Sequence, residues 1–213
     1  MKYLTLFLSF FIFNNILGQT ASADYYNKAQ NIRDKNKLIE AINYYDSAII
    51  RNPTFLEALY YRGITFGYLK RDFDAFRDFD KVVKLNPSFK ESYKYRGMSR
   101  DPHNLEELKL SNDDYSNHLR AYPNDSEIFF MRANNYGVLK DYLSALKDLN
   151  KAIELNSKNG DYYKMRGITI FNLGTSKFKI VPANIRKMAC DDISKAQSLG
   201  VVVDDKIVSE ICK

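Results

Sequence analysis

Four arginines and four aspartates recur at regular spacings in this sequence, in a pattern that predicts ion pairs. Each arginine directly precedes a small residue, as in Tyr61-Arg62-Gly63, and each aspartate follows in the next amphipathic segment. A bidentate guanidinium–carboxylate pair would fix the register of two helices, whereas a row of arginines alone would bind anionic ligands. The first segment of the series has Lys28 and Tyr44 instead and so lacks both partners, which favours structural pairs. The predicted pairs are Arg62 with Asp78, Arg96 with Asp114, Arg132 with Asp148, and Arg166 with Asp192.

The residue types that usually carry catalysis or bind metals show no matching pattern. The two histidines, His103 and His118, do not have the spacing of metal ligands. The sequence contains no His-Glu-x-x-His motif, glycine-rich phosphate loop, nucleophile elbow or Cys-x-x-Cys motif. Its carboxylates, such as Asp72, Asp74 and Asp80, lie on periodic outer faces. We therefore expect a protein without enzymatic activity, metal or cofactor.

The composition is typical of a soluble globular protein. The chain has 213 residues, of which 45% are apolar, 27% charged and 14% aromatic, so it is neither a disordered tail nor a protein with several membrane spans. Its net charge of +6 comes from 32 basic and 26 acidic residues and is too weak to indicate nucleic-acid binding.

The first residues follow the order of a secretory signal. Lys2 supplies a positive charge, an apolar run extends from Leu4 to Phe13, and small residues follow near Gly18. We expect a signal peptide over residues 1–18, cleaved within the window 18–23, and an exported protein that is periplasmic or secreted. An uncleaved membrane anchor is the alternative, but the run from Tyr3 to Leu17 is shorter than the ~20 residues that a bilayer requires.

A period of about 34 residues organises the rest of the chain. Pro53, Pro87 and Pro123 each close an amphipathic segment, and Ser157 occupies the matching place in the next one. Small residues precede these ends at fixed distances, with a large apolar residue between them. The small residues are Ala41, Ala48, Ala75, Val82, Ala145 and Ala152, and the large ones are Tyr45, Phe79, Tyr115 and Leu149. Further upstream a small residue recurs at Ala29, Gly63, Gly97, Ala133 and Gly167, which predicts two closely crossing helices in each repeat.

This pattern resembles the tetratricopeptide repeat (TPR), a helix-turn-helix unit of 34 residues. The resemblance implies an all-α fold, a right-handed α-solenoid of about five repeats over residues 22–200. The repeats span about 22–55, 56–89, 90–125, 126–159 and 160–200, and residues 201–213 form a C-terminal capping helix. All five prolines fall between the expected helices, and nothing in the sequence predicts a strand.

Two repeats depart from the common pattern. The third has a longer turn at residues 101–104 and carries Ser111 and His118 at positions where alanine is usual. The fifth has extra residues between Leu173 and Ala189, and we expect those from Pro182 onward to lengthen its second helix. The capping helix is expected to begin at Asp204 and to cover the end of the stack with Ile207, Val208 and Ile211.

The two cysteines lie at the C-terminal end, at Cys190 and Cys212. An even number of cysteines in an exported chain indicates a disulfide. The segment around Cys190 also resembles the closing repeat of exported bacterial TPR proteins. A bond between the two would attach the capping helix to the fifth repeat, whereas two free buried thiols are the alternative.

In the TPR family, the first helices of successive repeats line a groove that receives a segment of another protein. The resemblance assigns to this groove Tyr26, Gln30, Tyr60, Tyr61, Ile64, Lys94, Tyr95, Met98, Phe130, Met131, Asn134, Lys164, Met165 and Ile168. Aromatic and methionine side chains are favoured at interfaces, although they can equally complete the packing between helices. The basic and amide clamp that some members use for a chaperone's C-terminal carboxylates is not reproduced, because Tyr26, Gln30, Tyr61 and Glu91 occupy its places.

Positive charge is concentrated in the fifth repeat. Six basic residues and no acidic one lie between Tyr162 and Cys190. The insertion at 174–187 contains the predicted basic patch, Lys177, Lys179, Arg186 and Lys187. This insertion is either a solvated loop or a site that recruits an acidic partner or an anionic envelope surface.

Together these features predict a non-enzymatic scaffold that binds a peptide or protein segment in the groove, within the cell envelope. A structural subunit of an envelope complex, or an envelope-anion-binding module that uses residues 174–187, are the alternatives. A membrane is expected as a partner only if the signal peptide is not cleaved.

Overall fold

A computed structural model describes residues 20–34, 37–89 and 91–213, and the predicted signal peptide at 1–18 lies outside these ranges. Every regular element in the described part is a helix. The chain divides into two compact units, Met1–Arg100 and Asp101–Lys213, here called the N-terminal and C-terminal bodies. No helix of the described ranges is long and apolar enough to cross a bilayer.

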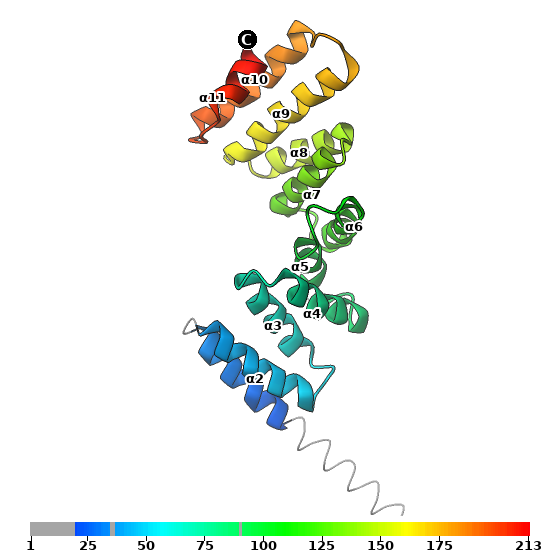
Figure 1. Cartoon of the computed structure of the whole chain (residues 1–213), viewed down its shortest axis with the longest axis vertical. Coiled ribbons are helices and arrows are strands. Elements are labelled where there is room, and N and C mark those ends of the chain that lie inside the picture. The colour runs from blue at the N-terminus through cyan, green and yellow to red at the C-terminus, as the bar shows by residue number, and fades with distance from the viewer. Residues whose placement is uncertain (1–19, 35–36, 90) are drawn as a thin grey trace, which may run out of the picture. The chain divides into compact units, whose positions relative to one another are not determined.

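The N-terminal body consists of helices that pack on their neighbours in chain order (Figure 1). A helical segment at 20–34 is followed by α2 (Leu38–Arg51), α3 (Leu56–Tyr68), α4 (Asp72–Leu85) and α5 (Ser92–Met98). Ala29 in the first segment packs with Tyr45 of α2 and Ala58 of α3, which joins the three elements in one core.

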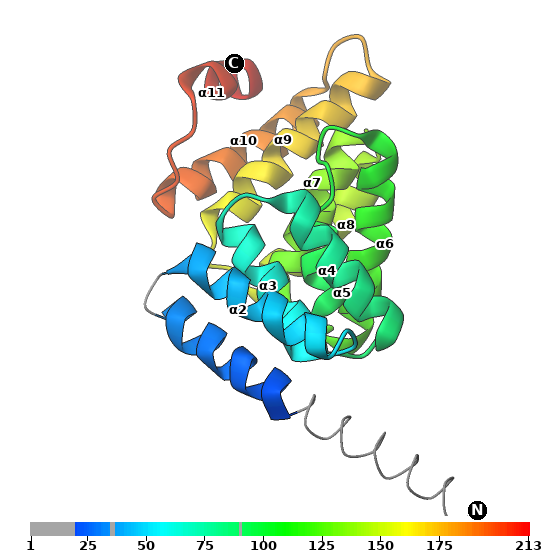
Figure 2. The same cartoon turned by 60° about the horizontal axis from the view of Figure 1, so that its bottom comes forward.

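The C-terminal body likewise consists of helices that pack on their neighbours in chain order. Its helices are α6 (Leu105–Ala121), α7 (Ser126–Val138), α8 (Tyr142–Leu155), α9 (Gly160–Lys177), α10 (Ala183–Ser198) and α11 (Asp205–Cys212). The helices α9 and α10 lie side by side, and α11 packs on α10 (Figure 2).

The periodic small and large residues form the core, which confirms the pattern predicted from the repeats. The alanines and Val82 at the two small positions have no exposed surface, and the large residues between them are also buried. The glycines mark close helix crossings: a Cβ atom on Gly63 would lie 2.9 Å from Cζ of Phe79, and one on Gly167 would lie 2.7 Å from the carbonyl oxygen of Ala189. A larger residue would therefore push the paired helices apart.

The third repeat differs most from the others. Its first helix, α5, has only seven residues, and the boundary between the two bodies falls in the longer turn that follows. Asn104 caps the N-terminus of α6, because its side-chain oxygen accepts a hydrogen bond from the backbone N–H of Glu106 at 2.9 Å. His118, at an alanine position, is buried with Nε2 3.0 Å from Asp125 Oδ2.

The extra residues of the fifth repeat lengthen both of its helices. Pro182 precedes α10, as predicted, but α9 also continues to Lys177, which the sequence pattern did not indicate. The capping helix α11 begins after Asp204, whose carboxylate accepts from the N–H of Lys206 at 2.7 Å. The structure contains the Cys190–Cys212 disulfide, which links α10 to α11 with their Cα atoms 5.1 Å apart.

Three of the predicted arginine–aspartate pairs are present as bidentate contacts. Each guanidinium donates from Nε and Nη2 to both oxygens of one carboxylate, at 2.6 to 2.8 Å. These pairs are Arg62–Asp78, Arg132–Asp148 and Arg166–Asp192. The fourth pair stays a prediction, because Arg96 and Asp114 belong to different bodies. Burial raises the pKa of Asp78, while the hydrogen bonds and the charge of Arg62 act in the opposite direction.

Every arginine of the series also reaches back to the preceding repeat, which the sequence analysis missed. In each case Nη1 donates to a side chain 16 residues earlier. The acceptors are Asp46 for Arg62, Asp80 for Arg96, Ser116 for Arg132, and Asn150 for Arg166. Each arginine therefore links its own repeat to the preceding one, and the acceptor of its Nη1 atom is a carboxylate in the N-terminal body and a neutral group in the C-terminal body.

Candidate functional site

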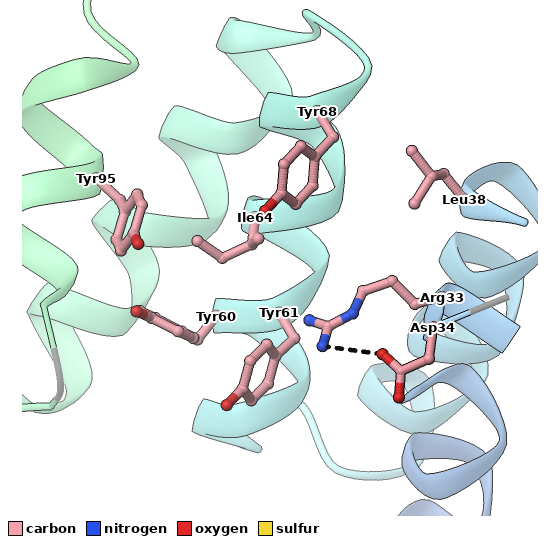
Figure 3. Close-up of a pocket in the computed structure, with 8 residues that line it drawn as sticks. All are labelled: Arg33, Asp34, Leu38, Tyr60, Tyr61, Ile64, Tyr68 and Tyr95. Atoms are coloured by element: carbon pink, nitrogen blue, oxygen red, sulfur yellow. Dashed lines mark hydrogen bonds and ion pairs between the residues drawn. The ribbon is translucent and has the colours of Figure 1, made fainter. Parts of the chain in front are cut away.

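A tyrosine-rich hollow of about 800 Å³ lies in the N-terminal body. The helix α3 supplies Tyr60, Tyr61, Ile64 and Tyr68 (Figure 3). Ile64 follows Tyr60 by four residues and Tyr61 by three, and Tyr68 follows Ile64 by four, so these side chains succeed one another along the helix. Tyr95 of α5 borders the hollow on one side, and residues of the first two helices border it on the other (Figure 3). This tyrosine pocket is lined by Arg33, Asp34, Leu38, Tyr60, Tyr61, Ile64, Tyr68 and Tyr95.

The inner rings of the tyrosine pocket are held by one another. Tyr60 is only 6% exposed, and its ring centroid lies 5.2 Å from that of Tyr61 and 5.8 Å from that of Tyr95, both edge to face. Phe79 of α4 stacks against Tyr95 at 5.5 Å. Tyr68 is by contrast 71% exposed at the rim. The pocket therefore combines rigid inner rings with an outer ring that can contact a ligand.

The charged groups of the tyrosine pocket balance each other. The Arg33 guanidinium lies 4.8 Å from the centroid of the Tyr61 ring and is paired with Asp34 at 3.5 Å. One cation and one carboxylate give this site no net charge. It can offer a hydrogen-bond donor and an acceptor at the edge of an aromatic surface.

The buried phenols of Tyr60 and Tyr95 stay neutral at physiological pH. Burial raises the pKa of Tyr60, and burial likewise raises the pKa of Tyr95. These two hydroxyls are hydrogen-bonded to each other, and their remaining acceptor capacity suits the N–H groups of a peptide backbone.

The groove residues predicted for the first three repeats gather around this pocket. Tyr26 lies next to it, with its ring centroid 6.1 Å from that of Tyr61, and its hydroxyl accepts a hydrogen bond from Gln30 Nε2 at 2.7 Å. Ile64, Tyr95 and Met98 also line an adjoining hollow of about 400 Å³. Lys94 lies half-buried on α5, next to Tyr95.

The predicted groove residues of the C-terminal body mostly complete the core. Met131, Met165 and Ile168 pack against three buried clusters, and the Phe130 ring lies 5.0 Å from that of Tyr162. Lys164 is paired with Asp161 at 2.8 Å. Asn134 has a buried side-chain oxygen without a hydrogen-bond partner among the described residues.

Two of the four residues in the predicted basic patch contact other groups of the same chain. Arg186 Nη1 donates to the backbone carbonyl oxygens of Glu210 and Ile211, at 2.6 and 3.2 Å, and so caps the end of α11. Lys187 is paired with Asp191 at 2.7 Å. Lys177 and Lys179 are exposed. The positive charge that the insertion offers to a partner is therefore smaller than its sequence indicates.

Known structures share this helical arrangement. MamA from Desulfovibrio magneticus RS-1, from residue 41 to its end, superposes with a TM-score of 0.73 at 20% identity, over 84% of this chain and 95% of that one. A further MamA crystal structure gives a TM-score of 0.70 at 17% identity, over 86% and 98%. YrrB, described as a TPR protein with an unusual peptide-binding site, gives 0.67 at 18% identity, over 83% and 90%. This is the fold of a TPR protein. No protein-family model and no curated protein matches the sequence.

Four residues of the tyrosine pocket were missed by the repeat alignment that assigned the TPR groove. They are Arg33, Asp34, Leu38 and Tyr68. Tyr68 follows Ile64 by one helical turn, and Arg33 follows Gln30 by three residues, so the helical spacing alone could have identified these two. Leu38 is the first residue of α2, and its side chain faces those of α3 from the other side of the pocket (Figure 3). Because this contact joins two different helices, the spacing within one helix could not predict it.

Proposed function

We propose that this TPR protein is a non-enzymatic scaffold that binds an extended or helical segment of a partner protein in the tyrosine pocket. The pocket itself is the observation that carries this proposal. Its volume of about 800 Å³ falls within the range of about 300–1,000 Å³ for ligand sites, and its rings offer large contact area at a small entropic cost. The peptide-binding site named for YrrB, a protein of the same fold, supports the same role.

Export is part of the proposal. The order of charged, apolar and small residues at 1–18 favours a signal peptide, and the Cys190–Cys212 disulfide is typical of proteins in oxidising compartments. We therefore place the scaffold in the periplasm or outside the cell, where its partner is another envelope or secreted protein. N-terminal sequencing of the protein recovered from the producing cells tests this location: a mature chain that begins within 18–23 supports export, and a retained Met1 in the cytosolic fraction contradicts it.

Peptide selection tests the binding site. A displayed library of random peptides is selected on the purified chain, and the recovered peptides are measured against two variants. Tyr68→Ala removes an exposed ring at the rim of the tyrosine pocket, and Phe73→Ala removes an exposed ring of α4 that does not line it. Tyrosine is enriched among the interface residues whose truncation costs more than about 1 kcal/mol, and a bound segment would cover the Tyr68 ring. We therefore expect Tyr68→Ala to weaken binding at least fivefold and Phe73→Ala to leave it unchanged. Equal binding to both variants would refute the proposed site.

A further inference from the structure

A second hollow lies in the C-terminal body, between the second helices of two successive repeats. Its volume is about 530 Å³, and it shares no residue with the tyrosine pocket. The helices α6 and α8 supply most of its lining, and α7 supplies two residues between them. We call it the α6–α8 pocket, and it is lined by Ser116, Leu119, Arg120, Phe129, Arg132, Lys147, Asp148, Asn150, Lys151 and Glu154.

Positive charge exceeds negative charge in this pocket. Its lining contains four cations and two carboxylates, and both carboxylates are already engaged. Asp148 accepts from Arg132, and Glu154 accepts from Lys151 at 2.7 Å. Arg120 donates to the neutral amide oxygen of Asn117. Lys147 is exposed and forms no ion pair with any residue that the structure describes. Two of the cations are therefore left without a counterion from the lining.

Comparison with the corresponding site of the N-terminal body shows that the two arginines differ in their second acceptor. The Nη1 atom of Arg62 donates to the carboxylate of Asp46 at 2.6 Å, in addition to the bidentate contact with Asp78. The Nη1 atom of Arg132 donates instead to the hydroxyl of Ser116 at 2.8 Å. Ser116 and Asp46 occupy the same position, 16 residues before their arginines, so Arg132 has one carboxylate where Arg62 has two.

We propose that the α6–α8 pocket binds a carboxylate of an acidic partner peptide, which supplies next to Arg132 and Ser116 the negative charge that Asp46 supplies next to Arg62. The Arg132 side chain is 16% exposed, so a ligand can reach it from the pocket. Lys147 and Arg120 provide further charge-assisted hydrogen bonds from the same lining. Phe129, which is half-buried, offers apolar surface to the residue next to the carboxylate.

A pair of short peptides tests this proposal on the full chain. The first probe is acetyl-Glu-Leu-Glu-Leu-amide, and the matched control is acetyl-Gln-Leu-Gln-Leu-amide. Binding is measured by titration with NMR detection of the arginine side-chain Nε–H signals. We expect the acidic peptide to bind at least tenfold tighter, to shift the Arg132 signal, and to weaken as salt is added. Equal affinity of the two peptides, or an Arg132 signal that does not move, overturns the proposal.

Three variants locate the binding and separate it from general attraction to a basic protein. Ser116→Asp places a carboxylate where Asp46 lies in the first arginine site, so we expect at least a tenfold loss of acidic-peptide binding in a folded protein. Lys147→Glu reverses a charge in the pocket, and Lys158→Glu makes the same change in the exposed turn after α8. Lys147→Glu should lose acidic-peptide binding, and Lys158→Glu should keep it. Equal losses at Lys147 and Lys158 overturn the proposal, even if Ser116→Asp does not fold.

Discussion

Replacing Gly167 with alanine tests whether close helix crossing is the reason for the recurring small residue. The added Cβ would lie 2.7 Å from the backbone oxygen of Ala189 and 3.2 Å from Cβ of Asp192 and from Cδ1 of Ile193. Contacts between a carbon and a carbonyl oxygen normally measure about 3.3 Å or more, so α9 and α10 must separate by roughly 0.6 Å at this point. Because the obstacle is backbone rather than a flexible side chain, rotamer changes cannot relieve it.

Two opposing effects determine how much Gly167→Ala changes the free energy of unfolding. Overpacking of a core costs about 1–3 kcal/mol, and the rigid obstacle puts this site in the upper part of that range. Replacing glycine with alanine within a helix stabilises that helix by about 1 kcal/mol. We therefore expect Gly167→Ala to lower the free energy of unfolding by about 1–2 kcal/mol. The separation should also strain the Arg166–Asp192 pair, because Asp192 is among the residues displaced.

Gly137→Ala is the matched control in the same body. A Cβ at Gly137 has no neighbouring atom within 4 Å, so the substitution should stabilise the helix by up to about 1 kcal/mol. Urea unfolding followed by circular dichroism compares the two variants, and amide hydrogen exchange should accelerate in α9 and α10 of Gly167→Ala alone. If Gly167→Ala proves as stable as Gly137→Ala, the close-crossing argument for these glycines is wrong.

Two further predictions concern the bonds that hold the C-terminal body together. Arg132→Met should destabilise this body by about 3–5 kcal/mol, because Asp148 would remain buried without its bidentate partner. The double variant Arg132→Met, Asp148→Leu should recover most of this loss, because it removes the unpaired charge as well. Stability is measured by urea unfolding, and a double variant no more stable than Arg132→Met would contradict this account. Removing the Cys190–Cys212 bond by Cys190→Ala and Cys212→Ala should lower stability by about 3 kcal/mol for a separation of 22 residues. Dithiothreitol should lower the melting temperature of the parent protein but not that of the double variant, and an unchanged parent would count against a stabilising disulfide.

The repeat pattern was enough to predict the helices and their core. Alanine at positions 41, 75 and 145 and large residues such as Phe79 recur because every repeat must pack the same two helices together, so the constraint is visible in a single sequence. The bidentate pairs could be predicted for the same reason. Repeats two to five contain both the arginine and the aspartate, and the first repeat contains neither. Two unrelated surface residues would not be expected to show this joint occurrence.

Features that depend on the local surroundings of one repeat could not be predicted. The basic residues at 174–187 predicted an exposed basic patch, but Arg186 donates to backbone carbonyl oxygens at the end of α11. The sequence around Arg186 does not indicate that α11 packs there. The second acceptor of each arginine likewise belongs to the preceding repeat and varies from Asp46 to Asn150. The groove positions assigned by resemblance line a hollow in the N-terminal body, whereas Met131 and Met165 pack inward, and repeat spacing alone does not distinguish the two cases.

The last turn of α11 is secured twice, by the covalent bond at Cys212 and by the two carbonyl contacts of Arg186. A linear stack of repeats ordinarily frays from its ends, where each module has a neighbour on one side only. Here α11 cannot separate completely from α10 without breaking a covalent bond, so a pulling force applied to α11 is transmitted directly to α10.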